Sequence, residues 1–498
     1  MSSSPSAQTA PTPVVPAAAA PPAPPAPPAS RALSAKAITA AIAILAVSAF
    51  VMILNETVLS VALPQLMRDF GVSATTVQWL TTGFLLTMAV VIPTTGFLLQ
   101  RFTLRRLFLV AISLFLVGTV LAAVAPSFAV VLVARVLQAA GTAMVMPLLM
   151  TTTLTLVPPM HRGTVMGLNS IVISVGPAVG PTLSGIVIEA FSWRWVFGFM
   201  VPIAVVALVI GATFMPRIGG GGRAALDLPS VVLSLLGFGG LVTATSTVSD
   251  LANGSLVPLI SGVVGIAGLV WFVIRQRALV ASGSGRALLD LSPFRERSFA
   301  LSVVLVMIAM GTMLGTVIVL PMFAQSVLGM SVLATGLMLL PGGVTQGLLS
   351  PFVGRLYDAV GPFPLVVPGT VLLAASEWWM VTIDAATTVP TIVAMHVVFS
   401  IGMSLVLTPM LTHALSGVPV RLYGHGSAIV NAMQQLAGAL GIAAMVGGLA
   451  WGAALSGAAG PAGEAAGVRT AFVVAGIIAL IGVACAPFIG RRSAPRGA

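Results

Sequence analysis

The chain has 498 residues, of which 58% are hydrophobic and only 7% are charged. A soluble globular domain carries roughly 25% charged residues, so the composition excludes that class and predicts an integral membrane protein. The net charge of +11 would suit a nucleic-acid-binding protein, but the placement of the basic residues excludes that class too. A single cysteine, Cys485, excludes an intramolecular disulfide.

Residues 1–35 form a stretch rich in Pro, Ala and Ser that cannot bury a core, and we predict a disordered or polyproline-like cytoplasmic tail. A cleaved signal peptide is the alternative interpretation. It is disfavoured because the apolar segment that follows is too long and contains Asn55 and Glu56. Residues 491–498 are predicted to form a second cytoplasmic tail.

Fourteen apolar runs of roughly 20 residues, each long enough to cross a bilayer, follow the first tail. They predict an all-α integral membrane protein with six helices over 36–216, two inserted helices and a cytoplasmic loop over 217–297, and six helices over 298–490. The runs lie near 38–63, 77–99, 107–125, 128–152, 164–188, 195–215, 228–249, 256–274, 299–323, 333–353, 364–383, 389–413, 425–451 and 469–489.

The basic residues test this topology, because Lys and Arg collect in the cytoplasmic loops of membrane proteins. With the N-terminus in the cytoplasm, Arg68, Arg194 and Arg469 fall in outer loops, and Arg135 falls inside a span. The rest of the 22 Lys and Arg residues fall in cytoplasmic segments. Lys36 is the only lysine, an arginine bias that hints at a GC-rich bacterial genome. We therefore expect a multi-pass protein of the bacterial inner membrane with both termini in the cytoplasm.

A short pattern occurs twice at predicted cytoplasmic ends of spans. Gly96 to Arg101 follows the second span, and Gly354 to Gly361, which includes Asp358, follows the tenth. Two six-helix halves related by an internal repeat, with two helices inserted between them, explain the spacing. Chance recurrence of one short motif is the alternative.

Few ionisable residues fall inside the spans: Glu56, Arg135 and Glu377, with His396 and His413 less deep. A charge near the bilayer centre costs roughly 2.5–3.5 kcal/mol, so such residues are functional candidates. Glu56 and Arg135 both lie about 10–12 Å below the outer surface, counted along their helices. Glu377 stands beside two tryptophans and is predicted either as a snorkelling or water-exposed carboxylate or as a second proton or cation site. His396 is predicted as a packed or interfacial residue rather than a proton relay.

Six elements occur in chain order: Asn55-Glu56-Thr57 before Val61-Ala62-Leu63-Pro64; Gly96 to Arg106; Arg135-x-x-Gln138-x-x-Gly141; Gly163 with Gly176-Pro177-x-x-Gly180-Pro181; Trp193-Arg194-Trp195-x-Phe197 with Pro202; and Leu289-Asp290-Leu291-x-x-Phe294-Arg295-x-Arg297-x-Phe299. Together they resemble the major facilitator superfamily, in particular its fourteen-helix drug:proton antiporters (EmrB/QacA type), and most of all the lincomycin-resistance-type exporters. The resemblance covers nearly everything after residue 38.

The resemblance implies the major facilitator fold and efflux of hydrophobic or cationic drugs and antibiotics, lincosamides among them, driven by the proton motive force. It implies a monomer in the lipid bilayer that is coupled to protons and needs no cofactor. The alternative is a dedicated exporter of one endogenous metabolite, lipid or self-made antibiotic.

The resemblance also implies roles for residues at matching positions. The candidates for the substrate cavity are polar residues of three helices: Asn55, Gln138, Asn431, Gln434 and Gln435. The candidates for a cytoplasmic gate are Gly96, Arg101, Arg105, Gly354, Arg355, Asp358 and Gly361. The residues that resemble the antiporter motif of the fifth helix are Gly163, Gly176, Pro177, Gly180 and Pro181.

The chain departs from the family pattern at several sites, two of which change a charged position. Asn55 stands where an Asp is usual, and the acid is displaced by one residue to Glu56, a rotation of about 100° on a helix. Gln100 replaces the usual Asp of the first loop. The first-half gate is therefore predicted to lack the carboxylate–arginine contacts that Asp358 and Arg355 provide in the second half.

Because the first and fourth helices of the superfamily face each other across a central cavity, the resemblance implies that Glu56 and Arg135 form a direct or water-bridged pair. We hypothesise that Glu56 alternates between protonated and ionised forms, with Arg135 stabilising the ionised form. A fixed structural ion pair that no substrate touches is the alternative.

Other function classes are disfavoured. A chain with one lysine has no Gly-x-x-x-x-Gly-Lys loop for ATP, which excludes an ATP-driven pump in one chain. Four scattered histidines and one cysteine predict no metal site, so we expect neither a metal nor an enzyme. A channel or receptor would not need the antiporter motif.

Overall fold

The computed structural model describes residues 35–72, 74–220, 226–247, 254–458 and 460–490. The predicted tails at 1–35 and 491–498 lie outside these ranges, except for Ala35, which begins the first helix. In these ranges the chain consists of helices and connecting turns, without a strand. The all-α prediction is confirmed.

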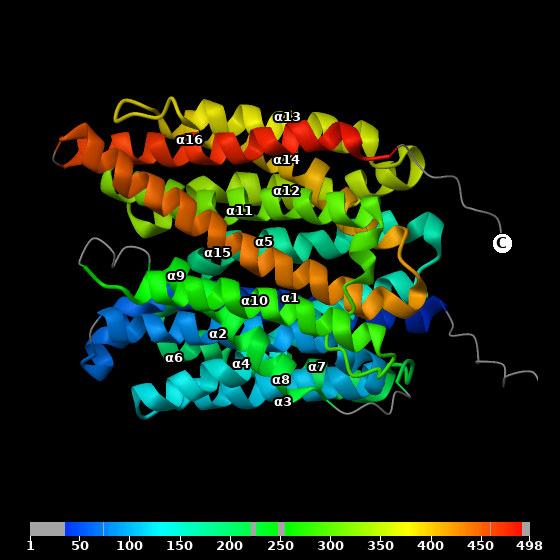
Figure 1. The fold of residues 1–498 in the computed structure, drawn as a ribbon. Helices are drawn as coiled ribbons and strands as arrows, with labels where there is room; N and C mark the ends of the chain where they lie inside the picture. Colours follow the sequence, from blue (N-terminus) through cyan, green and yellow to red (C-terminus); the bar gives the residue numbers. More distant parts are fainter. Residues whose placement is uncertain (1–34, 73, 221–225, 248–253, 459, 491–498) are drawn as a thin grey trace, which may run out of the picture.

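The helices fall into three groups along the chain (Figure 1). The first group is α1 (Ala35–Phe70), α2 (Ala74–Arg101), α3 (Leu104–Ala123), α4 (Phe128–Leu156), α5 (Arg162–Ala190), α6 (Trp193–Gly198) and α7 (Met200–Phe214). The inserted pair consists of two spans. The first is made of α8 (Leu228–Ser234), the π-helical turn η2 (Leu235–Gly239) and α9 (Gly240–Ser246), and the second is α10 (Val257–Ala281). The last group is α11 (Arg297–Ser326), α12 (Val332–Val360), α13 (Phe363–Met380), α14 (Val389–Ser416), α15 (Tyr423–Ser456) and α16 (Pro461–Cys485).

Thirteen helical stretches of the described residues are long and apolar enough to cross a membrane. α6 and α7 together make one of them, and α8, η2 and α9 make another. α5, with 29 residues, is the further helix that completes the predicted fourteen. Most helices are longer than the predicted runs; α1, for example, continues to Phe70, and α16 begins at Pro461.

The start of α1 and the end of α16 lie at the same end of the bundle, on the right in Figure 1. An even number of spans requires this arrangement. The α2–α3, α4–α5, α10–α11 and α14–α15 connections lie at this end as well, and they carry many of the arginines. We call it the basic end.

Two helices cross between the first and last groups. α5 packs along α12, and α15 packs on α2 and α4 (Figure 1). Glycines permit the first crossing: a Cβ on Gly163 would lie 2.5 Å from the carbonyl oxygen of Gly354, and one on Gly167 would collide with the carbonyl of Ser350. Small residues let two helix backbones approach closely in a membrane.

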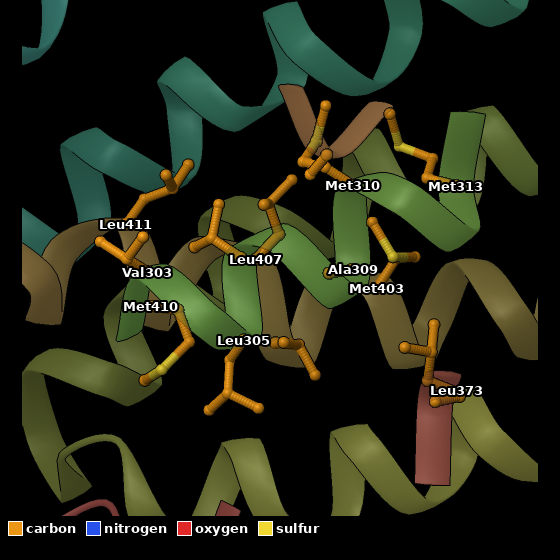
Figure 2. Close-up of a cluster of buried hydrophobic side chains, with 14 of the residues drawn as sticks. Val303, Leu305, Ala309, Met310, Met313, Leu373, Met403, Leu407, Met410 and Leu411 are labelled. Carbon is orange, nitrogen blue, oxygen red and sulfur yellow. The ribbon is translucent and has the colours of Figure 1, made fainter. Parts of the chain in front are cut away.

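Methionine and leucine side chains fill the core of the last group. Figure 2 shows Met310 and Met313 of α11 and Leu407 and Met410 of α14 in one buried cluster, with Leu373 of α13 nearby. Because lipid tails are as apolar as these side chains, close packing rather than the hydrophobic effect holds such helices together. Flexible methionines can fill gaps between helices that shift against each other.

A buried carboxylate, Asp227, ties the inserted pair together at the basic end. Arg275 of α10 donates two hydrogen bonds to it, from Nε to Oδ2 at 2.7 Å and from Nη2 to Oδ1 at 2.8 Å. The Ser230 backbone N–H also donates to Oδ2, at 3.1 Å, so Asp227 caps α8. The Arg275 hydrogen bonds lower the pKa of Asp227 to about 2.

Asp227→Asn should destabilise the protein, because it removes the ion pair with little change in shape. We expect a loss of about 1–3 kcal/mol in the free energy of unfolding at pH 7. The pKa of Asp227 in the folded protein lies below the ordinary value of 3.8, so the contribution is complete above about pH 4 and is lost as the pH falls toward 2. The difference in the free energy of unfolding between Asp227→Asn and wild type should therefore become smaller below about pH 4.

The measurement is thermal unfolding of the purified protein in detergent at pH 7 and at lower pH. Glu296→Gln, which changes an exposed acid at the same end of the bundle, is the matched control. A Tm at pH 7 equal to that of wild type would contradict the prediction.

Candidate functional site

A cavity of about 600 Å³ lies between the first and last helical groups. Its wall is mostly apolar and comes from α1, α2, α4, the inserted pair, α11, α12 and α15. It extends from Glu56 and Arg135, in the middle of the bundle, to Gln325 and Thr335, at the ends of α11 and α12 away from the basic end. The cavity therefore reaches toward the end opposite the basic one.

A smaller cavity of about 100 Å³ continues toward the basic end. Asn431, Gln434 and Gln435 of α15 line it, so these predicted cavity residues do reach a cavity. Glu56 and Gln435 line both cavities and therefore stand where the two meet. Methionines of α2, α4 and α11 form much of the remaining wall.

Arg135 of α4 is 1% exposed and lies in a cradle of neutral groups. Its Nη1 donates to Asn55 Oδ1 at 2.7 Å and to Gln138 Oε1 at 3.1 Å, and its Nε donates to the Leu80 carbonyl at 3.4 Å. The Phe84 ring lies against the guanidinium, with 4.1 Å from Cζ to the ring centroid. These acceptors and the cation–π contact offset part of the cost of a charge inside a span.

Asn55 and Gln138 hold Arg135 and do not line either cavity. Both are 0% exposed. Asn55 also donates to Met200 Sδ at 3.3 Å, and Gln138 donates to Thr119 Oγ1 at 3.2 Å. The prediction that these two residues line a substrate cavity is wrong. Asn55 faces α4 and α7, whereas the next residue of α1 is rotated from it by about 100°.

Glu56 is that next residue, and its carboxylate reaches both cavities. No nitrogen–oxygen contact within 4.0 Å joins it to Arg135, although both residues are described and both line the larger cavity. The direct ion pair is therefore not formed, and the water-bridged pair stays a prediction. The separation leaves the Glu56 carboxylate accessible from the cavity.

Glycines of the fifth helix set the position of Glu56. A Cβ on Gly176 would lie 2.7 Å from Cγ2 of Ile53, and one on Gly180 would collide with Oγ1 of Thr57. Because Ile53 and Thr57 flank Glu56 on α1, a larger residue at either glycine would push α1 away from α5. The side chains of Pro177 and Pro181 are not among those that the structure describes.

At the basic end, Asp358 of α12 holds the start of α5. The backbone N–H of Gly163 donates to Oδ1 at 2.8 Å, and the backbone N–H and the hydroxyl of Thr164 donate to Oδ2 at 2.8 Å and 2.9 Å. The carboxylate thus meets the positive end of the α5 dipole. With Gly354 pressed against Gly163, this contact closes the bundle at the basic end.

Two of the other predicted gate residues, Arg101 and Arg355, are exposed at the same end of the bundle. Arg105 donates to the carbonyl of Ala212 near the end of α7. Gly361 ends α12 with a φ of 80°, a conformation that glycine adopts at little cost.

The equivalent contact of the first half joins α2 to α15. Gln100 Nε2 lies 2.7 Å from His425 Nε2, and a Cβ on Gly96 would lie 2.7 Å from His425 Nδ1. Gln100 and Gly96 stand at the same spacing as Asp358 and Gly354. The first half therefore lacks the carboxylate, as predicted, but keeps a polar contact at the same place.

The motifs above did not single out the partners Thr164 and His425, although the sequence carried a signal for them. Val157-Pro158 precedes Gly163-Thr164 at the spacing at which Val418-Pro419 precedes Gly424-His425. Both segments form a short 3₁₀ turn and then begin a helix. At each crossing, a segment of the first repeat (on α2 or α12) contacts a segment of this second repeat (on α15 or α5).

Glu377 and His396 lie outside both cavities. Glu377 of α13 is 0% exposed and accepts a hydrogen bond from Thr316 at 3.2 Å, so the water-exposed interpretation is wrong. Its Oε2 has no hydrogen-bond partner among the described residues. His396 is packed, as predicted: it is 6% exposed and stacks on Phe399 with 6.1 Å between ring centroids.

Comparison with known proteins agrees with this architecture. The chain is 40% identical over 451 residues to the lincomycin resistance protein LmrB of Listeria monocytogenes, which covers 89% of this chain and 95% of that one. LmrB of Bacillus subtilis is 39% identical over 456 residues, with 89% and 94% covered. The multidrug export protein EmrB of Haemophilus influenzae is 29% identical over 404 residues, with 79% and 77% covered.

Among solved structures, the human organic anion transporter MFSD10 (TETRAN) superposes with a TM-score of 0.64 at 16% identity. The match covers 90% of this chain and 99% of that chain, and at this identity it supports the fold alone. Residues 45–442 match the Major Facilitator Superfamily, which is most of the chain. This multi-pass membrane protein therefore belongs to the major facilitator superfamily of transporters.

Proposed function

We propose that the protein exports hydrophobic or cationic drugs, lincosamides among them, in exchange for protons. The observation that carries the proposal is the placement of Glu56, a carboxylate that lines an apolar cavity and is not paired with the nearby Arg135. A side chain that can lose and gain a proton, and that also faces the substrate space, can couple the two. The names of the LmrB and EmrB relatives support the export of antibiotics and drugs.

The substrate class follows from the cavity wall. Apolar side chains of α2, the inserted pair, α11, α12 and α15 surround the space, and a carboxylate and an arginine lie at one side of it. An apolar wall binds hydrophobic compounds of varied shape, and the carboxylate attracts a positive charge. This combination suits lipophilic cations and weakly basic antibiotics.

The proposed cycle places the basic end in the cytoplasm, following the positive-inside rule. The arrangement described above, clamped at the basic end, is then the outward-facing state. A proton that enters from outside neutralises Glu56 and releases a bound cation. Rocking of the two halves opens the basic end, where Glu56 loses the proton and substrate binds. One proton exchanged for one monovalent cation moves no net charge, so the pH gradient drives this exchange; with a neutral drug the proton also contributes about 2.3 kcal/mol per 100 mV.

Glu56→Gln should abolish proton-coupled export, because glutamine fills the same space without exchanging a proton. We expect drug-triggered collapse of a pH gradient to fall about 100-fold or more, the lower end of the effect of removing a positioned acid–base group. The measurement uses proteoliposomes that hold a pH gradient, with lincomycin and lipophilic cations as added drugs.

Glu464→Gln, which changes an exposed acid in the first turn of α16, is the control and should behave as wild type. Proton-coupled export by Glu56→Gln at the wild-type rate would contradict the assignment of the carrier. If wild type responds to no drug of a broad panel, the dedicated exporter of one metabolite becomes the better interpretation.

Asp358→Asn should weaken the closure at the basic end, because a neutral amide interacts less favourably with the α5 dipole and can accept fewer of its hydrogen bonds. We expect the closed arrangement to lose about 1–2 kcal/mol, enough to change populations roughly 5- to 30-fold. The measurement is maleimide labelling of Ser350→Cys, a buried position of the clamp, in a Cys485→Ser background. Labelling from the basic end should become faster.

Glu189→Gln, at the other end of α5, is the matched control and should leave the labelling rate unchanged. Equal labelling rates for Asp358→Asn and wild type would contradict the role of Asp358 in closure.

A further inference from the structure

The inserted pair does not lie at the periphery of the bundle. η2 packs on α2, and α9 packs on both α2 and α15 (Figure 1). The hydroxyl of Ser234 donates to the Ala89 carbonyl of α2 at 3.3 Å, and a Cβ on Gly239 would lie 3.1 Å from Leu86. The pair therefore covers the side of the cavity where the first and last groups meet at α2 and α15.

A π-helical turn in this pair presents one aromatic ring to the cavity. η2 inserts a wider turn between α8 and α9, and such turns often occur at functional positions. Gly237 and Gly240 lie directly against α10, because a Cβ on either would come within 2.9 Å of Leu269 or Gly265. With that face of η2 and α9 fixed on α10, Phe238 reaches the cavity wall.

Phe238 and Val242 are the contribution of the inserted pair to the larger cavity. Phe238 is 5% exposed and belongs to a buried cluster with Phe84, Ala89 and Leu436. Two aromatic rings thus line this cavity within the described residues, Phe84 and Phe238. Arg135 covers the Phe84 ring at 4.1 Å, whereas Phe238 meets the edge of another ring.

That other ring is Phe272 of α10, whose centroid lies 6.3 Å from that of Phe238 at an interplanar angle of 75°. Phe272 is 2% exposed and lines neither cavity. It supports Phe238 from behind in a T-shaped arrangement that aromatic pairs favour. Phe238 and Phe272 are therefore packed against each other, but only Phe238 lines the cavity.

We propose that the inserted pair forms part of the substrate-binding wall and that Phe238 is its aromatic contact for the ring systems of planar aromatic cations. The proposal rests on the export function proposed above. It assigns the inserted helices a role in substrate selection in addition to structural support. Compounds without an aromatic ring should depend on Phe238 far less.

The test compares Phe238→Leu with Phe272→Leu, two substitutions of the same chemistry in one aromatic pair. Transport is measured in everted vesicles with ethidium, a planar aromatic cation, and with lincomycin, which has no aromatic ring. We expect Phe238→Leu to raise the KM for ethidium about 3- to 10-fold, the size of one aromatic contact, and to change the KM for lincomycin less than about twofold. Phe272→Leu should change the KM for both compounds by the same factor or leave both KM values unchanged.

Equal shifts for ethidium and lincomycin in Phe238→Leu would overturn the proposal, as would the same selective shift in Phe272→Leu. Transport of lincomycin but not of ethidium by wild type would overturn the aromatic contact while leaving export intact. Transport of neither compound would contradict the proposed function instead.

A binding readout keeps the inference testable in that last case. Val242→Cys in a Cys485→Ser background places the only thiol in the cavity wall. Ethidium should slow its labelling by maleimide several-fold and should leave Val263→Cys unaffected, because Val263 is 69% exposed on α10 and lines neither cavity. Absence of protection at Val242→Cys would overturn the assignment of this wall to substrate.

Discussion

The cavity depends on one contact, the clamp between the start of α5 and the end of α12. Asp358 accepts three hydrogen bonds from Gly163 and Thr164, while the backbones at Gly163 and Gly354 meet without room for a side chain. Because the halves are pressed together at the basic end, the space between them lies on the other side of the clamp. A charge-assisted contact of this kind is strong, yet all three of these hydrogen bonds depend on one carboxylate.

The second crossing, between α2 and α15, is built from the same repeat but differs in charge. A neutral contact between Gln100 and His425 takes the place of the carboxylate that caps α5. Charge-assisted hydrogen bonds are roughly twice as strong as neutral ones, so the two crossings differ in strength although they match in position. The inserted pair packs beside this neutral crossing, on α2 and α15. The neutral one of the two crossings is thus the one that the inserted helices cover.

In the middle of the bundle, the positions of Arg135 and Glu56 follow from the energetic cost of burying the Arg135 guanidinium. Asn55 and Gln138 supply neutral acceptors and Phe84 supplies a ring face, so the guanidinium does not need a carboxylate to be accommodated. Glu56 can then face the cavity instead of being held in a fixed ion pair. On α1 the carboxylate at position 56 therefore faces the cavity, while the amide at position 55 binds Arg135. Glycines 176 and 180 hold α1 close enough to α5 to keep that carboxylate in place.

The sequence by itself determined the class of protein, the helices and the charged residues inside them. Apolar runs and the distribution of arginine are local properties that the bilayer constrains directly, so the fourteen helices and the positions of Glu56 and Arg135 could be predicted. Only the tertiary structure decided that Arg135 binds Asn55, that Glu377 is buried against Thr316, and that Asp358 caps α5. The physical reason is that residues facing lipid and residues facing other helices are equally apolar, so hydrophobicity does not reveal the rotation of each helix. Rotation and close approach, set by glycines at the crossings, determine which polar groups meet.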